Sequence, residues 1–185
     1  LAAVTGTINL TPATTFVAQP GDGCAHQTTL VLAGGGSLAA VTITVTGTDA
    51  NGNVQTEAIA GPSATTTLTK YFKTLTSVTS SADLTGSTMN VGWTALCFTP
   101  TIPVALYPHD GPVVSISPAS LTLTVQQTVS PVYTTAYSSV IWQTLIASGT
   151  ASAIAQALIG VSGIRCAITV SSPGTLSMDI AQARR

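Results

Sequence analysis

Apolar and polar residues alternate along most of the chain. Val41–Thr46 alternates strictly between an aliphatic residue and threonine, and Val54–Ile59 continues in similar style. A period of two is the pattern of a β-strand with one buried face. Between these segments lies a polar turn, Asp49–Asn53, in which Gly52 supplies the positive φ that a tight turn needs. The two segments are therefore predicted to form a β-hairpin.

The same alternation recurs from end to end, with Gly, Pro, Asn and Asp between the segments. The predicted strands are Leu30–Leu32, Leu38–Thr46, Val54–Ile59, Thr66–Thr79, Met89–Phe98, Ser120–Val129, Ser139–Leu145, Ser162–Val170 and Thr175–Ala183. The alanine-rich segment Ala151–Leu158 is the one candidate helix. Short strands joined by short turns predict an all-β protein built as an antiparallel β-sandwich, of jelly-roll or Ig-like type.

Prolines divide the chain into two parts. Five of them fall within Thr99–Pro118, and because proline cannot donate a hydrogen bond to a sheet, this segment is predicted to be a linker or crossover. A boundary near Asp110–Pro112 then gives two sandwich subdomains, an N-terminal domain of residues 1–110 and a smaller C-terminal domain of residues 111–185.

Charge is scarce. Charged residues make up 6% of the chain, where about 25% is usual. Five Lys and Arg residues are too few for a phosphate-binding surface. Direct binding of nucleic acid is therefore not expected. No apolar run approaches the roughly 20 residues of a spanning helix, so no membrane partner is expected either.

Three cysteines, Cys24, Cys97 and Cys166, lie far apart. An odd number at wide spacing does not match a disulfide framework. We predict three reduced thiols that act as small buried apolar side chains.

The strongest candidate for metal or nucleophile chemistry is the loop around Cys24 and His26, to which Asp22 would add a third ligand. Zinc sites usually have four ligands, and the only other histidine, His109, is distant in the sequence. An ordinary loop cysteine and histidine is the competing interpretation and the favoured one.

Catalytic motifs are missing from the sequence. No G-x-S-x-G elbow is present, and the glycine run Gly34–Gly36 lacks the Lys-Ser/Thr that completes a phosphate loop. Asp49 and Asp83 occupy turn positions, where aspartate caps its own backbone. The remaining carboxylates are Asp22, Glu57, Asp110 and Asp179. We predict no catalytic residue, no metal site and no cofactor, and hence a protein that is not an enzyme.

Aromatic residues are predicted to serve packing and contacts. One ring of Lys70–Lys73 (KYFK) is expected to enter the core while the lysines stay outside. Trp93 and Trp142 are expected to anchor one core each. Tyr107, Tyr133 and Tyr137 fall in predicted loops, where exposed aromatics mark protein interfaces.

Several of these stretches together resemble a known group of proteins. The hairpin TVTGTDANGNVQTEAIAGP, the strand TTTLTKYFKTLTSVT and the later SLTLTVQQT, VIWQTL and GIRCAITVSSPGTLSMDIAQA are similar to segments of tailed-bacteriophage virion structural proteins. The likeness covers most of the chain from about Val41 onward. The loop Ser130–Tyr133 lacks the acidic residues of the family, so no partner contact carries over to that loop.

The resemblance implies a non-enzymatic virion component. Its expected role is that of a capsid decoration, or cement, protein on the outer capsid surface of a virion assembled in the host cytoplasm. Its expected partners are the major capsid protein and copies of itself, as a dimer or trimer. Three alternatives stay open: a neck, tail or fibre-base component, a secreted bacterial surface adhesin, and a hydrolase built on Cys24, His26 and Asp22 or on His109.

Overall fold

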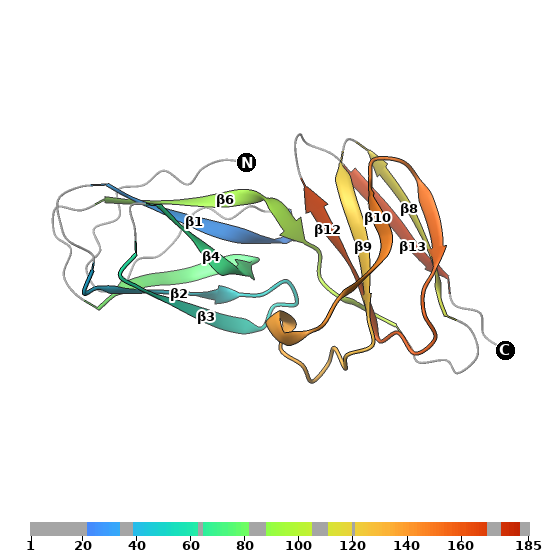
Figure 1. The fold of residues 1–185 in the computed structure, drawn as a ribbon, viewed down its shortest axis with the longest axis horizontal. Coiled ribbons are helices and arrows are strands. Elements are labelled where there is room, and N and C mark those ends of the chain that lie inside the picture. The colour runs from blue at the N-terminus through green and yellow to red at the C-terminus, as the bar shows by residue number, and fades with distance from the viewer. Residues whose placement is uncertain are drawn as a thin grey trace. The chain divides into compact units, whose positions relative to one another are not determined.

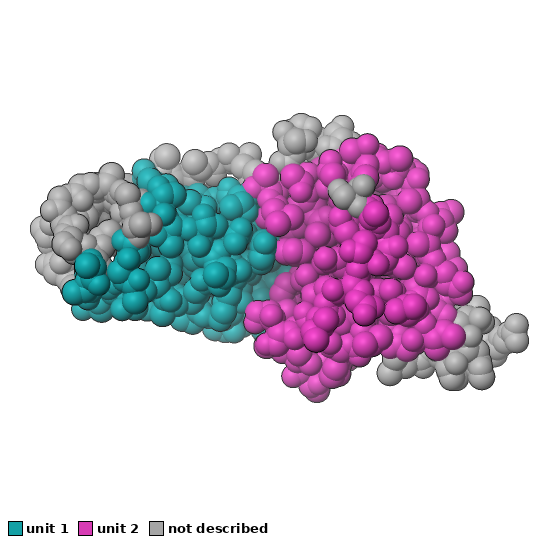
Figure 2. All heavy atoms as spheres, viewed as in Figure 1, with its two compact units in different colours: residues 1–94 teal, residues 95–185 magenta. Residues whose placement is uncertain are grey.

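The protein is an all-β protein with two compact units. The computed structural model describes residues 22–33, 39–62, 65–81, 88–104, 111–119, 121–169 and 175–181. Unit 1 comprises residues 1–94 and unit 2 residues 95–185 (Figure 2). The strands form one seven-stranded and two three-stranded antiparallel sheets, and each unit contains one of the smaller sheets and part of the larger one, which confirms the predicted β-sandwich architecture.

Unit 1 is a sandwich of two sheets. In one sheet β1 (Ala25–Ala33) lies between β4 (Thr65–Phe72) and β6 (Thr88–Phe98), whose residues up to Thr94 belong to this unit. In the other, β2 (Thr42–Thr48) lies between β3 (Val54–Ala60) and β5 (Thr74–Ser80) (Figure 1). The β2–β3 pair is the hairpin that the sequence predicts.

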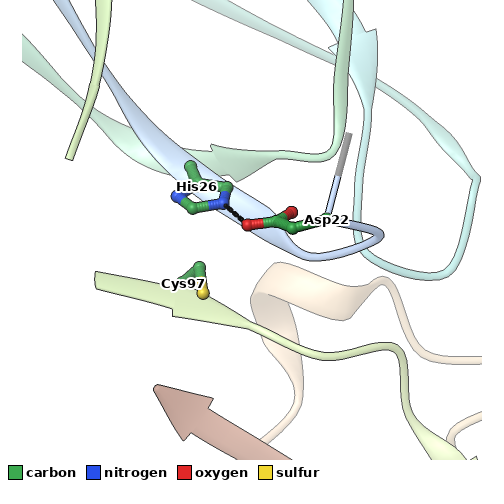
Figure 3. A group of neighbouring side chains, drawn as sticks. All are labelled: Asp22, His26 and Cys97. Carbon is green, nitrogen blue, oxygen red and sulfur yellow. Dashed lines mark hydrogen bonds and ion pairs between the residues drawn. The ribbon is translucent and has the colours of Figure 1, made fainter. Parts of the chain in front are cut away.

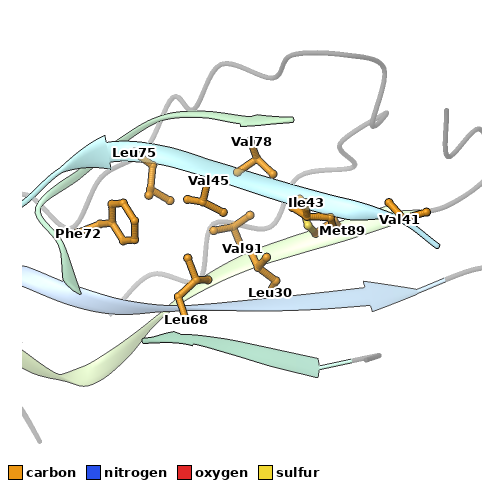
Figure 4. Close-up of a cluster of buried hydrophobic side chains, with 10 residues drawn as sticks. All are labelled: Leu30, Val41, Ile43, Val45, Leu68, Phe72, Leu75, Val78, Met89 and Val91. Atoms are coloured by element: carbon orange, nitrogen blue, oxygen red, sulfur yellow. The ribbon is translucent and has the colours of Figure 1, made fainter. Parts of the chain in front are cut away.

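The core of unit 1 fills the space between these sheets (Figure 4). Its members are at most 5% exposed, and Ile59 and Trp93 pack against them. The cluster consists of Leu30, Val41, Ile43, Val45, Leu68, Phe72, Leu75, Val78, Met89 and Val91. Full burial of a side chain of this size stabilises the fold by about 1.5–3 kcal/mol. Alternation therefore places one face of each strand in the core and leaves threonines on the other.

The hairpin turn is held by Asp49, as its turn position predicts. The Asp49 Oδ1 atom accepts hydrogen bonds from the backbone N–H groups of Asn51 and Asn53, both at 2.9 Å. Gly52 has a φ of 89°, in the left-handed region that favours glycine. Asp49 is buried, so its carboxylate replaces water as the partner of these amides. The corresponding prediction for Asp83 lies outside the described residues.

The predicted single strand Thr66–Thr79 is wrong, because the structure forms two strands there. β4 pairs with β1 in one sheet, β5 pairs with β2 in the other, and the chain crosses between the sheets at Lys73. Phe72 and Leu75 both point into the core, a spacing of three that an uninterrupted strand with period two cannot provide.

Gly47 makes this crossing possible. A Cβ atom at Gly47 would lie 2.0 Å from the Thr74 carbonyl oxygen and 2.9 Å from the Phe72 ring. Only glycine lets β2 approach the crossing chain so closely.

Unit 2 is a second sandwich. In one sheet, the strands follow the order β10 (Gln143–Gly149), β9 (Thr122–Thr128), β12 (Gly163–Thr169). The short strand β7 (Ile102–Pro103) and the last residues of β6 also pair with β12. The other has the order β11 (Ala153–Gln156), β8 (Val113–Ala119), β13 (Thr175–Ala181). A short 3-10 helix, η1 (Tyr137–Ser139), precedes β10. Fully buried side chains such as Val114, Leu123 and Ile164 form the interior.

The structure divides the chain earlier than the sequence predicts. Along the chain, unit 1 ends at Thr94 and unit 2 begins at Ala95, both within β6. The predicted domains were residues 1–110 and 111–185. The sequence does not reveal this division because β6 is one uninterrupted strand. Its last residues, Leu96–Phe98, pair with β12 of unit 2.

The linker predicted over Thr99–Pro118 contains a central strand. β8 pairs with β11 through Val113–Ile116 and with β13 along its whole length. Pro118 is tolerated because β11 has already ended at this point, so only β13 lies beside the proline.

The helix predicted at Ala151–Leu158 is also wrong. Ala153–Gln156 is the edge strand β11, in which Ala153 and Ala155 pair with the inward-facing Ile116 and Val114 of β8. Alanine favours a helix in isolation, but here its small size suits the inner face of an edge strand, and tertiary pairing prevails over intrinsic propensity.

Candidate functional site

The predicted metal or nucleophile loop forms a tight turn at the start of β1. Gly23 has a φ of 78°, and the Asp22 Oδ1 atom accepts a hydrogen bond of 3.0 Å from the backbone N–H of Cys24. This bond folds the aspartate back over its own turn. The other carboxylate oxygen, Oδ2, then lies 2.6 Å from His26 Nε2 (Figure 3).

His26 is held through both ring nitrogens. Its side chain is fully buried, Nδ1 lies 3.0 Å from the Thr94 carbonyl oxygen, and the ring meets Trp93 edge-on at 6.1 Å between centroids. A backbone carbonyl only accepts hydrogen bonds, so Nδ1 carries a proton. Nε2, the other ring nitrogen, lies against the Asp22 carboxylate oxygen. His26 and Asp22 thus form a pair that fixes the start of β1 against β6.

These contacts determine what the loop can do chemically. A metal ligand or a general base needs a ring nitrogen with a free lone pair. In His26, one nitrogen is hydrogen-bonded to a carbonyl and the other to the Asp22 carboxylate. The arrangement supports a structural role for the pair.

The sequence grouped Cys24 with Asp22 and His26, and the structure uses the three residues differently. Cys24 contributes its backbone N–H to the turn, and the residue is partly exposed and forms no disulfide bond. Within either unit taken alone, the described residues contain no group of three His, Cys, Asp or Glu side chains close enough to share one ion. Cys97, also labelled in Figure 3, is a buried residue of unit 2. His109 lies outside the described residues.

Glu57 bridges the edges of the two sheets in unit 1. Its Oε1 atom accepts hydrogen bonds from the Thr69 backbone N–H at 2.8 Å and hydroxyl at 2.9 Å, and its Oε2 atom accepts one from the Lys70 N–H at 2.8 Å. Gln55 and Lys70 add side-chain bonds to the carbonyls of Tyr71 and Thr56, each across the same β3–β4 gap. Side chains thereby satisfy backbone groups of an edge strand that would otherwise be open to pairing with another chain.

This bridge was missed by sequence reasoning, which named Glu57 only as one of the remaining carboxylates. Glu57 is only partly exposed and pairs in register with the inward-facing Val45. The available signal was a lone carboxylate within an otherwise uncharged strand. In the KYFK segment, Phe72 enters the core as predicted, while Lys70 is partly buried and donates to Thr56.

The outer face of the β3–β2–β5 sheet carries no ionisable side chain. Thr46 and Thr48 of β2 contact Thr56 and Thr74 on the flanking strands through their hydroxyl groups, at 3.3 and 2.6 Å. This hydroxyl face, defined by strand register, consists of Thr42, Thr44, Thr46, Thr48, Val54, Thr56, Ala58, Ala60, Thr74, Ser77 and Thr79. It is a broad neutral surface suited to close contact with another neutral surface.

The one Lys or Arg side chain among the described residues of unit 2, that of Arg165, is buried. Arg165 is 8% exposed and its guanidinium carbon lies 4.0 Å from the centroid of the Phe98 ring and 4.1 Å from that of Trp142. The Tyr137 ring lies 5.1 Å away, and Arg165 Nε donates to Gln126 Oε1 at 2.8 Å. Arginine suits this site because its planar cation is weakly hydrated and stacks on aromatic faces.

The structure shows where the aromatic residues considered in the sequence analysis lie. Tyr137 was predicted to be an exposed loop residue; this is wrong, because it is buried and its hydroxyl donates to the Thr99 carbonyl. Tyr133 is 83% exposed, as predicted. Trp142 packs on Arg165 within unit 2, and Trp93 packs against the core of unit 1. Tyr107 lies outside the described residues.

The three cysteines form no disulfide bonds. Cys97 and Cys166 are buried, as predicted, while Cys24 is only partly buried. The Cys166 thiol lies 3.6 Å from the Met178 sulfur in the interior of unit 2.

Two further findings concern the chain as a whole. Within the part that the structure describes, no helix has the length and hydropathy to span a bilayer. Comparison with models of protein families, with curated proteins and with solved structures found no match.

Proposed function

We propose that the protein is a non-enzymatic structural component of a tailed-bacteriophage virion, a capsid decoration protein on the outer surface of the shell. Its partners would be the major capsid protein and further copies of itself. The proposal combines the sequence resemblance with the physical character of unit 1: a rigid sandwich that presents neutral surface and has its polar groups engaged in internal bonds.

The hydroxyl face is the observation that carries this proposal. A permanent interface must remove water from whatever it covers, and a hydroxyl group costs less to desolvate than an unpaired ammonium or carboxylate. Threonine also stiffens the strand, because branching at Cβ restricts its side chain. The face would therefore lose little conformational freedom when a neighbouring subunit covers it.

Internal use of the ionisable groups supports a structural role. In unit 1, Asp49 holds a turn, Glu57 joins two sheet edges, and Asp22 pairs with His26. These carboxylates are engaged in bonds that maintain the fold. A protein that acts through surface contact does not need these three carboxylates for any other purpose.

The test uses particles of the phage that encodes this chain. Mass spectrometry of purified particles should detect the protein, and an electron-microscopy map should place it on the outer capsid surface. Particles lacking it should release their DNA at a lower temperature. Absence of the protein from particles would contradict the proposal, and density at the neck or tail would exclude the decoration role.

A pair of matched substitutions tests the role of the hydroxyl face. Thr44→Glu places a charge in the middle of this face, and Thr67→Glu places the same charge on β4, in the other sheet of unit 1. Added back to particles that lack the protein, the Thr44 variant should bind at least about tenfold more weakly than wild type. The Thr67 variant should bind normally. Equal binding by both variants would exclude the hydroxyl face as the contact.

A further inference from the structure

Unit 2 exposes large apolar side chains at one end of its sandwich. Exposure reaches 83% for Tyr133, 75% for Ile141 and 61% for Val129 and Ile159. The set, which we call the apolar end of unit 2, consists of Ile102, Val129, Tyr133, Ile141, Leu158 and Ile159. Among the described residues of unit 1, only Val31 and Val54 are comparably exposed large apolar residues.

Hydrogen bonds from backbone and side-chain groups gather the segments that carry these residues. β9 ends and β12 begins at this end, where Thr128 pairs with Gly163 (Figure 1). Thr128 also donates its hydroxyl to the Ile141 carbonyl, and its own carbonyl accepts the Ser162 N–H. The Leu158 N–H donates to Gln127, next to Thr128. The exposed residues therefore lie around one common point of unit 2.

The loops at this end are held in place by internal hydrogen bonds. The Ser162 hydroxyl donates to the carbonyls of Thr128 and Ser130, and the Pro131 carbonyl accepts the N–H groups of Thr134 and Thr135. Loops that are ordered in this way lose little conformational entropy on binding. The apolar end is thus preorganised for contact.

Charge is absent from these segments. The described residues 99–104, 111–113, 128–142 and 157–163 include no Asp, Glu, Lys, Arg or His. Against these described segments, a charged partner would lose hydration without gaining an ion pair. A surface of the same neutral, apolar kind is complementary to it, and the end of a second copy is such a surface.

The exposed area is of the size that a pair of copies needs. Six side chains at 38–83% exposure present several hundred Å² of mainly apolar surface, comparable to or above the roughly 300–600 Å² of the largest patch on a typical monomer. Two copies meeting end to end, with the loop backbone included, would approach the roughly 1,200 Å² at which specific interfaces begin.

We propose that the apolar end of unit 2 is a self-association surface, covered by the same end of a second copy of this chain. This inference identifies the surface through which copies of the chain would meet, and it does not depend on the virion role. Contact between identical patches is the usual arrangement of a two-fold homodimer. The hydroxyl face of unit 1 would remain available for another partner.

Sedimentation velocity on the full chain, from about 1 to 100 µM, tests the proposal. Wild type should associate reversibly, while Ile141→Glu and Ile159→Glu should each raise the dissociation constant at least about tenfold, since each buries a carboxylate against apolar surface. Ile154→Glu is the matched control, because Ile154 is 73% exposed but lies on β11, opposite Ser115 of β8, and belongs to neither proposed surface; this variant should associate like wild type. Circular dichroism should show the same thermal unfolding for all three variants.

Three results would overturn the proposal. The first is a wild-type protein that stays monomeric across the whole range, which would leave the apolar end to a different partner. The second is normal association of both the Ile141 and Ile159 variants while they remain folded. The third is loss of association in the Ile154 variant, which would place the contact on the sheet that contains β11.

Discussion

The two units use the same architecture and treat polar groups in opposite ways. Unit 1 uses a carboxylate, Glu57, to join the edges of its two sheets, and it presents a neutral hydroxyl face. Unit 2 encloses a cation, Arg165, among aromatic rings and exposes large apolar residues at one end. Two sandwiches of similar design can therefore offer different surfaces, because the alternating pattern fixes the inner face of each sheet and leaves edges, ends and outer faces free to vary.

The largest effect is expected from removing the ring at the centre of unit 1. Phe72 is fully buried between the sheets, so Phe72→Ala should destabilise unit 1 by about 3–5 kcal/mol. Hydrogen exchange should then speed up in β2 and much less in β9. The reciprocal variant, Leu123→Ala in unit 2, should reverse this order. Equal acceleration in both strands for both variants would show that the two units unfold as one.

The Arg165 cluster is expected to give the next largest effect. Arg165→Ala removes a cation stacked on Phe98 and Trp142 and leaves a cavity, with an expected loss of about 2–3 kcal/mol in urea unfolding. Arg165→Lys keeps the charge without the planar group, and its loss should be smaller. An Ala variant as stable as wild type would mean that the buried cation adds nothing to unit 2.

Glu57 should contribute less, because its carboxylate is partly exposed. Glu57→Ala leaves the amides of Thr69 and Lys70 without their acceptor and should cost about 1–2 kcal/mol. Glu57→Gln retains one acceptor oxygen and should cost less. Hydrogen exchange at the two amides reports the bridge directly; unchanged protection in the Ala variant would contradict the proposed closure of this edge.

The smallest effect is expected on the hydroxyl face. Thr46→Val keeps the shape of a partly exposed side chain, so stability should change by less than about 0.5 kcal/mol while solubility falls. The matched control is Val45→Thr on the inner face of the same strand, where a buried hydroxyl should cost about 1–3 kcal/mol. Similar losses at both positions would mean that the two faces of β2 are not distinguished by burial.

Part of the candidate site was predictable from sequence. Asp49 and the Asn51-Gly52 turn follow from local chemistry, and the structure shows the expected hydrogen bonds. Asp22 and His26 were correctly grouped, because they lie four positions apart, at the two ends of one turn. Their engagement with Thr94 was not predictable, since that carbonyl lies on a distant strand.

The larger errors share one cause. The crossing at Lys73, the edge strand Ala153–Gln156 and the central strand Val113–Ala119 each depend on which strands become neighbours. Alanine content and proline content are local signals, and pairing between distant segments outweighed both. The division after Thr94 was hidden for the same reason, because a single strand passes through it.

The sequence by itself determined most of the strands and the hairpin turn of this protein, because alternation and turn chemistry act between residues that are close along the chain. Only the tertiary structure decided that Glu57 would join β3 to β4, that Arg165 would lie among three rings, and that apolar residues from separate loops would meet at one end of unit 2. These features arise where distant segments meet, and such meetings depend on the packing of the whole unit.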